Sequence, residues 1–181
     1  MRYPNAAAGL RLMFVGQILM IVGVLLAWAP FVGVLLIVAA PIAELAGVYK
    51  AGDDDENYRG ALVFIALVLV VNFISGFFAE GFLHSILDVA SEVLGLMVVF
   101  SVCNTTSNLL RSIGQEELSR RGGTVIQIYT ACTIISIVCG VLAFIPIINI
   151  AAALANGISS LAAVVGYVMY LLFLNSSSRV L

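Results

Sequence analysis

Long apolar segments alternate with short polar ones along the whole chain. Each apolar segment is about as long as a helix must be to cross a hydrocarbon core of about 30 Å at a rise of about 1.5 Å per residue. The pattern predicts an all-α integral membrane protein, a single transmembrane domain over residues 1–181. Its six transmembrane helices, arranged as three antiparallel hairpins, are expected at about residues 10–28, 31–49, 60–78, 86–103, 125–144 and 147–173.

Composition supports this class. Hydrophobic residues make up 62% of the chain and charged residues only 10%, whereas a soluble domain carries about 25% charged residues. A net charge of −2 and scattered basic residues argue against a nucleic-acid partner, which requires a clustered basic face. The lipid bilayer is the expected partner.

The basic residues predict the orientation. With six spans, all eight lie on one side of the membrane: Arg2, Arg11, Lys50, Arg59, Arg111, Arg120, Arg121 and Arg179. Cytoplasmic loops carry the excess of Lys and Arg, so both termini are predicted to be cytoplasmic. The short loops favour a multi-pass protein of the bacterial inner membrane.

Two polar segments interrupt the apolar pattern. The acidic loop at residues 51–59 lacks the spacing of a calcium-binding loop and is interpreted as a solvated loop. In the second segment, Leu109, Leu110, Ile113 and Leu118 form an apolar stripe. It predicts a cytoplasmic helix over about residues 107–121 that lies on the membrane surface.

Small residues recur at four-residue steps in three of the predicted spans. Such stripes let helix backbones approach closely where lipid provides no hydrophobic drive for association. The second, fourth and sixth spans are therefore expected to form the tightest inner contacts, and a homo-oligomer could use the same stripes. The residues concerned are Ala43, Gly47, Ser91, Gly95, Ala155 and Ser159.

Two hairpins resemble each other in sequence. Residues 25–48 align without gaps on residues 141–164, and both copies carry an aromatic residue two positions before a proline at the turn. Either an ancient duplication or chance similarity between apolar segments explains this internal repeat. A duplication would favour three hairpins packed in a ring.

Four ionisable residues follow one another at four-residue steps, a spacing that places them on one helical face: Glu80, His84, Asp88 and Glu92. With no second histidine or cysteine nearby, a metal site is not predicted. Ser85 and Asp88 have the spacing of a capping box at the start of the fourth span. Glu80, His84, Ser85 and Asp88 are thus interpreted as an outer cap or solute entry.

Glu44 and Glu92 lie inside predicted spans. A carboxylate in the membrane interior costs a few kcal/mol, so it usually faces a cavity or a partner. With Ser160 they form a predicted intramembrane polar site for a cation or proton. The alternatives are purely structural roles, in which Glu44 reaches toward Lys50 and Glu92 forms a hydrogen bond to Ser91, Ser160 or a carbonyl group as part of helix packing.

No catalytic constellation is recognisable, because the single histidine has no activated serine or cysteine beside it. Cys103, Cys132 and Cys139 fall in apolar segments and are interpreted as packing residues. We expect no enzyme, no cofactor and no metal. The leading hypothesis is a small transporter, channel or solute-binding subunit; the alternative is a structural or regulatory membrane protein that binds a protein partner and transports nothing.

Overall fold

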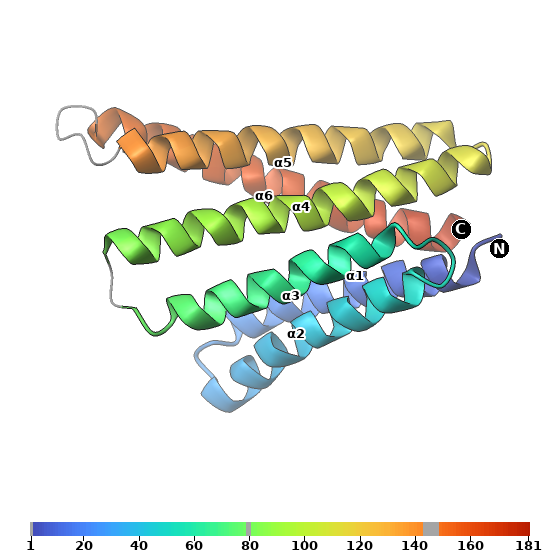
Figure 1. The fold of residues 1–181 in the computed structure, drawn as a ribbon, viewed down its shortest axis with the longest axis horizontal. Coiled ribbons are helices and arrows are strands. Elements are labelled where there is room, and N and C mark those ends of the chain that lie inside the picture. The colour runs from blue at the N-terminus through green and yellow to red at the C-terminus, as the bar shows by residue number, and fades with distance from the viewer. Residues whose placement is uncertain (1, 79–80, 143–148) are drawn as a thin grey trace.

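The described part of the chain is entirely helical. The computed structural model describes residues 2–78, 81–142 and 149–181, and these form six helices and no strands (Figure 1). The helices are α1 (Pro4–Leu25), α2 (Pro30–Ala51), α3 (Tyr58–Ser75), α4 (Phe82–Ser112), α5 (Glu116–Leu142) and α6 (Asn149–Val180). Each contains a stretch long and apolar enough to cross a membrane. The prediction of six apolar helices is confirmed, and they suggest a multi-pass membrane protein.

The helices pack in the order of the chain and close into a ring. Each contacts the next one along the sequence, and α1 also packs against α6. The two termini lie at the same end of the bundle (Figure 1). We call this the terminal end; it also holds the turns at residues 52–57 and 113–115. The far end holds the turn at residues 26–29.

Helix α1 begins six residues before the predicted span because a distant loop caps it. Pro4 takes the first helical position, where its missing N–H leaves no bond unmade. One carboxylate oxygen of Asp54 accepts a hydrogen bond from the Ala6 backbone N–H at 2.7 Å, and the other accepts one from the Asn5 side-chain amide at 3.0 Å. The acidic loop is therefore also a capping element.

The prediction of a separate surface helix over residues 107–121 is wrong. Helix α4 continues to Ser112, the chain turns at Gly114, and α5 begins at Glu116. Gly114 has a φ of 79°, a conformation that favours glycine. The apolar stripe does not face lipid. Leu110, near the end of α4, and Leu118, near the beginning of α5, are both buried in the core.

The prediction that the second, fourth and sixth spans form the tightest contacts is also wrong. Within the described residues, α2 contacts neither α4 nor α6, and α4 only touches α6. The most extensive interface joins α1 to α2, where a Cβ atom added to Gly47 would meet the Gly9 carbonyl oxygen. A stripe of small residues makes the close approach of two helices feasible but does not determine which helix approaches. Here the helix that approaches α2 is α1, the one before it in the chain.

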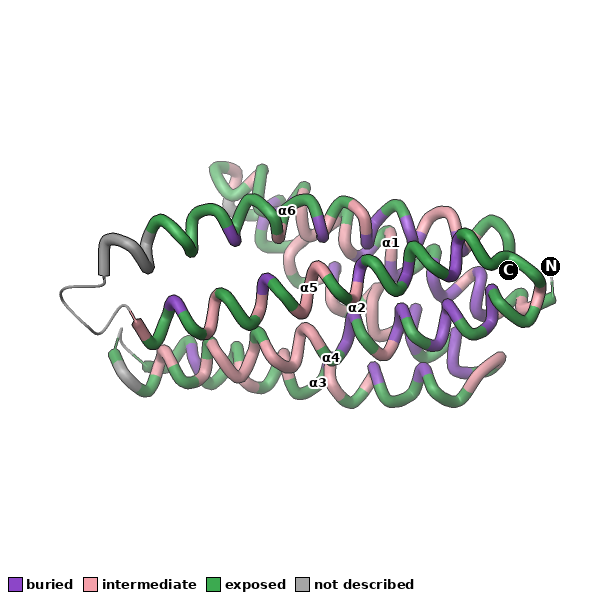
Figure 2. The backbone as a smooth tube through the Cα atoms, turned by 90° about the horizontal axis from the view of Figure 1, so that it is seen from above, coloured by how far each residue is buried: buried purple, intermediate pink, exposed green. Residues whose placement is uncertain are grey.

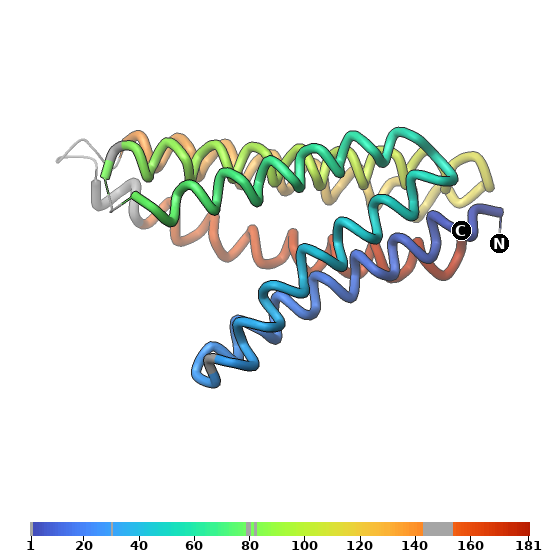
Figure 3. The backbone as a smooth tube through the Cα atoms, turned by 60° about the horizontal axis from the view of Figure 1, so that its bottom comes forward, coloured from blue at the N-terminus to red at the C-terminus, as the bar shows by residue number. Residues whose placement is uncertain are grey.

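The core is concentrated at the terminal end (Figure 2). Buried residues from different helices meet there, including Tyr58, Val102, Thr106, Leu110, Phe173 and Leu181. Toward the far end, the α1–α2 hairpin diverges from the other helices (Figure 3), and Trp28 and Phe31 are 80% and 87% exposed. The bundle is thus tightly packed at one end and splayed at the other. The second aromatic-x-Pro turn of the proposed repeat, at residues 144–146, lies outside the described residues.

Candidate functional site

A cavity of about 710 Å³ lies inside the ring and receives residues from all six helices. Most of its wall is apolar. The polar side chains in the wall come from every helix of the ring: Gln17, Glu44, Asn72, Glu92, Tyr129, Thr133, Ser136, Asn156, Ser159, Ser160, Tyr167 and Tyr170. The predicted polar site of Glu44, Glu92 and Ser160 is therefore brought together in one cavity.

Glu44 belongs to a series of side-chain hydrogen bonds that connects three helices. Its carboxylate accepts a hydrogen bond of 2.9 Å from the side-chain amide of Gln17 on α1. The carbonyl oxygen of the same amide accepts a bond of 2.6 Å from the Tyr167 hydroxyl on α6. Gln17 therefore links α2 to α6, and the network orients the Glu44 carboxylate at the cavity wall.

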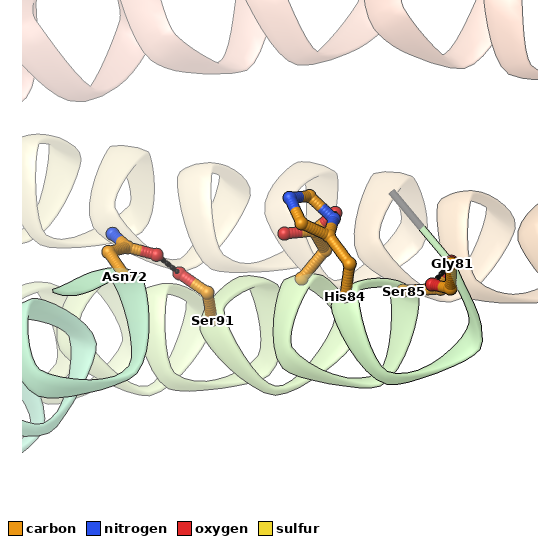
Figure 4. Close-up of polar contacts among 6 residues, drawn as sticks. Asn72, Gly81, His84, Ser85 and Ser91 are labelled. Atoms are coloured by element: carbon orange, nitrogen blue, oxygen red, sulfur yellow. Dashed lines mark hydrogen bonds and ion pairs between the residues drawn. The ribbon is translucent and has the colours of Figure 1, made fainter. Parts of the chain in front are cut away.

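Glu92 has a single side-chain partner among the described residues. Its carboxylate accepts a hydrogen bond of 3.2 Å from the Ser136 hydroxyl on α5. Ser91 instead donates to Asn72 on α3 at 2.7 Å (Figure 4), and Ser160 donates to the Asn156 carbonyl oxygen of its own helix at 2.9 Å. Of the residues expected to bond Glu92 as packing partners, neither Ser91 nor Ser160 does so, and much of the Glu92 side chain remains exposed.

The two carboxylates occupy different levels of the bundle. Glu44 is linked through Gln17 to Tyr167, whereas Glu92 is bonded to Ser136, one turn beyond Cys132 toward the far end. The Cys132 carbonyl oxygen accepts a bond of 3.3 Å from Ser159. Ser159 lies eight residues before Tyr167 on α6 (167 − 159), about 12 Å along the helix axis. Glu44 is therefore nearer the terminal end and Glu92 nearer the far end.

Both carboxylates have only neutral hydrogen-bond partners. Among the described residues that line the cavity there is no Lys, Arg or His. Lys50 forms no ion pair with Glu44 in the part of the chain that the structure describes. The described wall therefore offers neither carboxylate a countercharge, and an unpaired charge in apolar surroundings is strongly destabilised.

The residues predicted to form an outer cap make different contacts in the structure. The capping box is wrong, because α4 begins at Phe82 and Ser85 lies within its first turn, donating to the Gly81 carbonyl oxygen at 3.2 Å (Figure 4). Asp88 instead lies 2.9 Å from the Nδ1 atom of His84. Both of these side chains are partly exposed and neither lines the cavity. Glu80 lies outside the described residues.

The predicted packing residues have different surroundings. Gly47 lies in the close α1–α2 contact, and the buried Ser159 bonds α6 to α5. Gly95 lines the cavity, and a Cβ atom added there would meet no described atom within 4 Å. Ala155 is exposed and Ala43 is half-buried. Only part of the set therefore packs helices within this chain.

Several residues of the cavity escaped the sequence reasoning. Gln17, Asn72 and Asn156 carry no charge and were not among the predicted site residues. An amide inside an apolar span also requires a hydrogen-bonding partner, so these residues were recognisable as candidates. Tyr167 carried no such signal, because tyrosine is common in apolar helices.

Cys103, Cys132 and Cys139 are all buried, and among the residues that the structure describes no three His, Cys, Asp or Glu side chains are grouped to hold a metal ion. Comparison of the chain with protein-family models, with curated proteins and with solved structures gives no match.

Proposed function

We propose that the chain is a small membrane transporter or channel, or the solute-binding subunit of one, in which Glu44 and Glu92 bind a cation or a proton. The observation that carries the proposal is that both carboxylates line one central cavity whose described wall contains no basic residue. A bound cation or proton would offset the cost of a carboxylate in these surroundings.

The basic residues support an orientation with the terminal end in the cytoplasm. All eight lie at or near the helix ends on that side of the bundle, which is the distribution that the positive-inside rule predicts for cytoplasmic segments. The cavity would then be reached from outside, at the splayed far end. We assign the protein to a cell membrane, and its short loops favour the bacterial inner membrane.

The order of the two carboxylates suggests a path. A cation entering from the far end meets Glu92 first, where much of the side chain is exposed. Glu44 lies deeper and is linked to two helices through Gln17 and Tyr167. Passage to the cytoplasm would then require the core at the terminal end to open.

Flux into proteoliposomes tests the proposal. Purified protein is reconstituted with an indicator dye for the ion under test inside, and gradients of protons, Na⁺, K⁺, Mg²⁺ or an organic cation are applied across the membrane. We expect flux in the wild type and a reduction of about tenfold or more in Glu44→Gln and Glu92→Gln, which remove charge but keep shape. The matched control is Glu117→Gln, an exposed residue paired with Arg121 outside the cavity. Wild-type flux that both cavity variants retain would contradict the role of the two carboxylates, and no flux at all would contradict transport by the chain.

The alternative remains a structural or regulatory protein that binds another membrane protein. It favours a packed interior, and the central cavity is the observation that speaks against it. Crosslinking in native membranes distinguishes the two. A stoichiometric protein partner together with no flux would favour the alternative.

A further inference from the structure

The cavity has the size and lining of a site for an organic molecule. Its volume of about 710 Å³ falls within the range of about 300–1,000 Å³ common for small-molecule sites. Apolar side chains from five helices form much of the wall, among them Met20, Ile37, Val68, Leu96, Val99 and Ile128. A ligand that fills this space must have a largely apolar surface.

A bare inorganic cation fits the lining poorly. Calcium requires six to eight oxygen ligands and magnesium a near-octahedral set. Here Glu44 and Glu92 lie on different levels, and each has one neutral hydrogen-bond donor beside it. No group of three metal-binding side chains is found in the described parts of the chain. An inorganic ion would therefore stay largely hydrated in an apolar space.

The charge of the wall excludes anions and phospholipids. The described lining carries two carboxylates and no Lys, Arg or His, so a phosphate or carboxylate group in the ligand would have no cationic partner. Even a zwitterionic phospholipid brings a phosphate that the cavity cannot neutralise. The complementary ligand has positive charge only.

Aromatic rings add a second feature that suits a cation. Tyr129, Tyr167 and Tyr170 line the cavity, and Tyr129 packs edge to face on Tyr170 with ring centroids 6.1 Å apart. The face of an aromatic ring attracts cations, quaternary ammonium groups in particular. Tyr129 lies on α5, as does Ser136, the partner of Glu92, and Tyr167 on α6 bonds to Gln17, the partner of Glu44.

We propose that the cavity binds a lipophilic organic cation, with its charge beside Glu92 or Glu44 and its apolar groups against the aliphatic and tyrosine wall. This inference rests on the proposed function, since it names the class of solute for the same site. The divergence of the α1–α2 hairpin from the other helices (Figure 3) leaves the ligand a route at the far end.

Equilibrium binding of radiolabelled tetraphenylphosphonium to the purified chain in detergent tests this. Tetraphenylborate is the matched probe, since it has nearly the same size and shape and the opposite charge. We expect saturable tetraphenylphosphonium binding that tetraphenylborate and millimolar Mg²⁺ do not displace. The affinity should fall about tenfold or more in Glu92→Gln or Glu44→Gln and stay unchanged in Glu117→Gln.

A second variant tests the volume of the cavity without touching its charge. Gly95 lines the cavity and has open space where a side chain would project. Gly95→Leu should place a side chain in that space and weaken tetraphenylphosphonium binding, while size-exclusion elution and thermal unfolding confirm that the variant is folded. This variant remains informative if a glutamate variant fails to fold.

The outcomes separate this inference from the proposed function. Glutamate-dependent flux of protons or inorganic ions without tetraphenylphosphonium binding would overturn the inference and leave the proposed function standing. Binding that depends on the glutamates and Gly95, but without flux of protons, inorganic ions or tetraphenylphosphonium itself, would support the inference and reject transport. Equal binding of tetraphenylborate, or binding that persists in Glu44→Gln/Glu92→Gln, would overturn the inference.

Discussion

Gly47 on α2 lies so close to Gly9 on α1 that a Cβ atom added to Gly47 would come within 2.6 Å of the Gly9 carbonyl oxygen. The same added atom would lie 2.7 Å from a side-chain carbon of Met13. The two backbones are therefore in direct contact in the hairpin that diverges from the bundle. Its stability depends on glycine at this position.

Replacing Gly47 with alanine should destabilise the protein by about 1–3 kcal/mol, because the added methyl group overpacks a contact made by backbone atoms. Thermal unfolding in detergent measures the loss. The control is Gly123→Ala, where an added Cβ atom has no described neighbour within 4 Å. There the better helix propensity of alanine should be neutral or stabilise by up to about 1 kcal/mol. An unchanged melting temperature for Gly47→Ala would contradict the close packing.

Tyr58 and Thr106 should behave as a coupled pair at the terminal end. Their hydroxyl oxygens are 2.7 Å apart and both residues are 0% exposed. Either Tyr58→Phe or Thr106→Val leaves one buried hydroxyl without its partner, which costs about 1–3 kcal/mol. The double variant removes both groups and should cost less than the sum of the two. A double-mutant cycle in thermal unfolding measures the difference, and strict additivity would show that the bond contributes nothing.

Asp54 should contribute to the stability of α1 although it lies in another loop. Its carboxylate accepts hydrogen bonds from the Ala6 N–H and the Asn5 amide. Asp54→Ala removes this cap, with an expected loss of about 1–2 kcal/mol. Hydrogen exchange should accelerate at the first amides of α1. The exposed neighbour Asp53 serves as the control, and equal exchange in Asp53→Ala and Asp54→Ala would argue against the cap.

The orientation is testable with two single cysteines. The native Cys103, Cys132 and Cys139 are buried and should not react with a membrane-impermeant maleimide. Trp28→Cys, in the far-end turn, should be labelled from outside intact cells. Gln115→Cys, in the turn between α4 and α5, should be labelled only after permeabilisation. The reverse pattern would place the terminal end outside.

The polar site was only partly accessible from the sequence. Glu44 and Glu92 were identified because an ionisable residue in an apolar span is costly wherever it lies. The capping box at Ser85 was predicted and is wrong, because α4 begins at Phe82, before the local motif. The apolar stripe of Leu110 and Leu118 pointed to a lipid surface, yet tertiary packing covers it with other helices. Each wrong prediction treated one segment of the chain in isolation from the helices that pack against it.

The sequence by itself determined that the chain forms six apolar helices and that its basic residues lie at one end. Both follow from local properties: the length of an apolar run and the position of charges relative to it. Only the tertiary structure decided that α1 packs on α2 and α6, that Gln17 links Glu44 to Tyr167, and that all six helices surround a cavity. The reason is physical: Gln17 and Tyr167 are 150 residues apart (167 − 17), and no periodicity within a segment records which distant side chain completes a hydrogen bond.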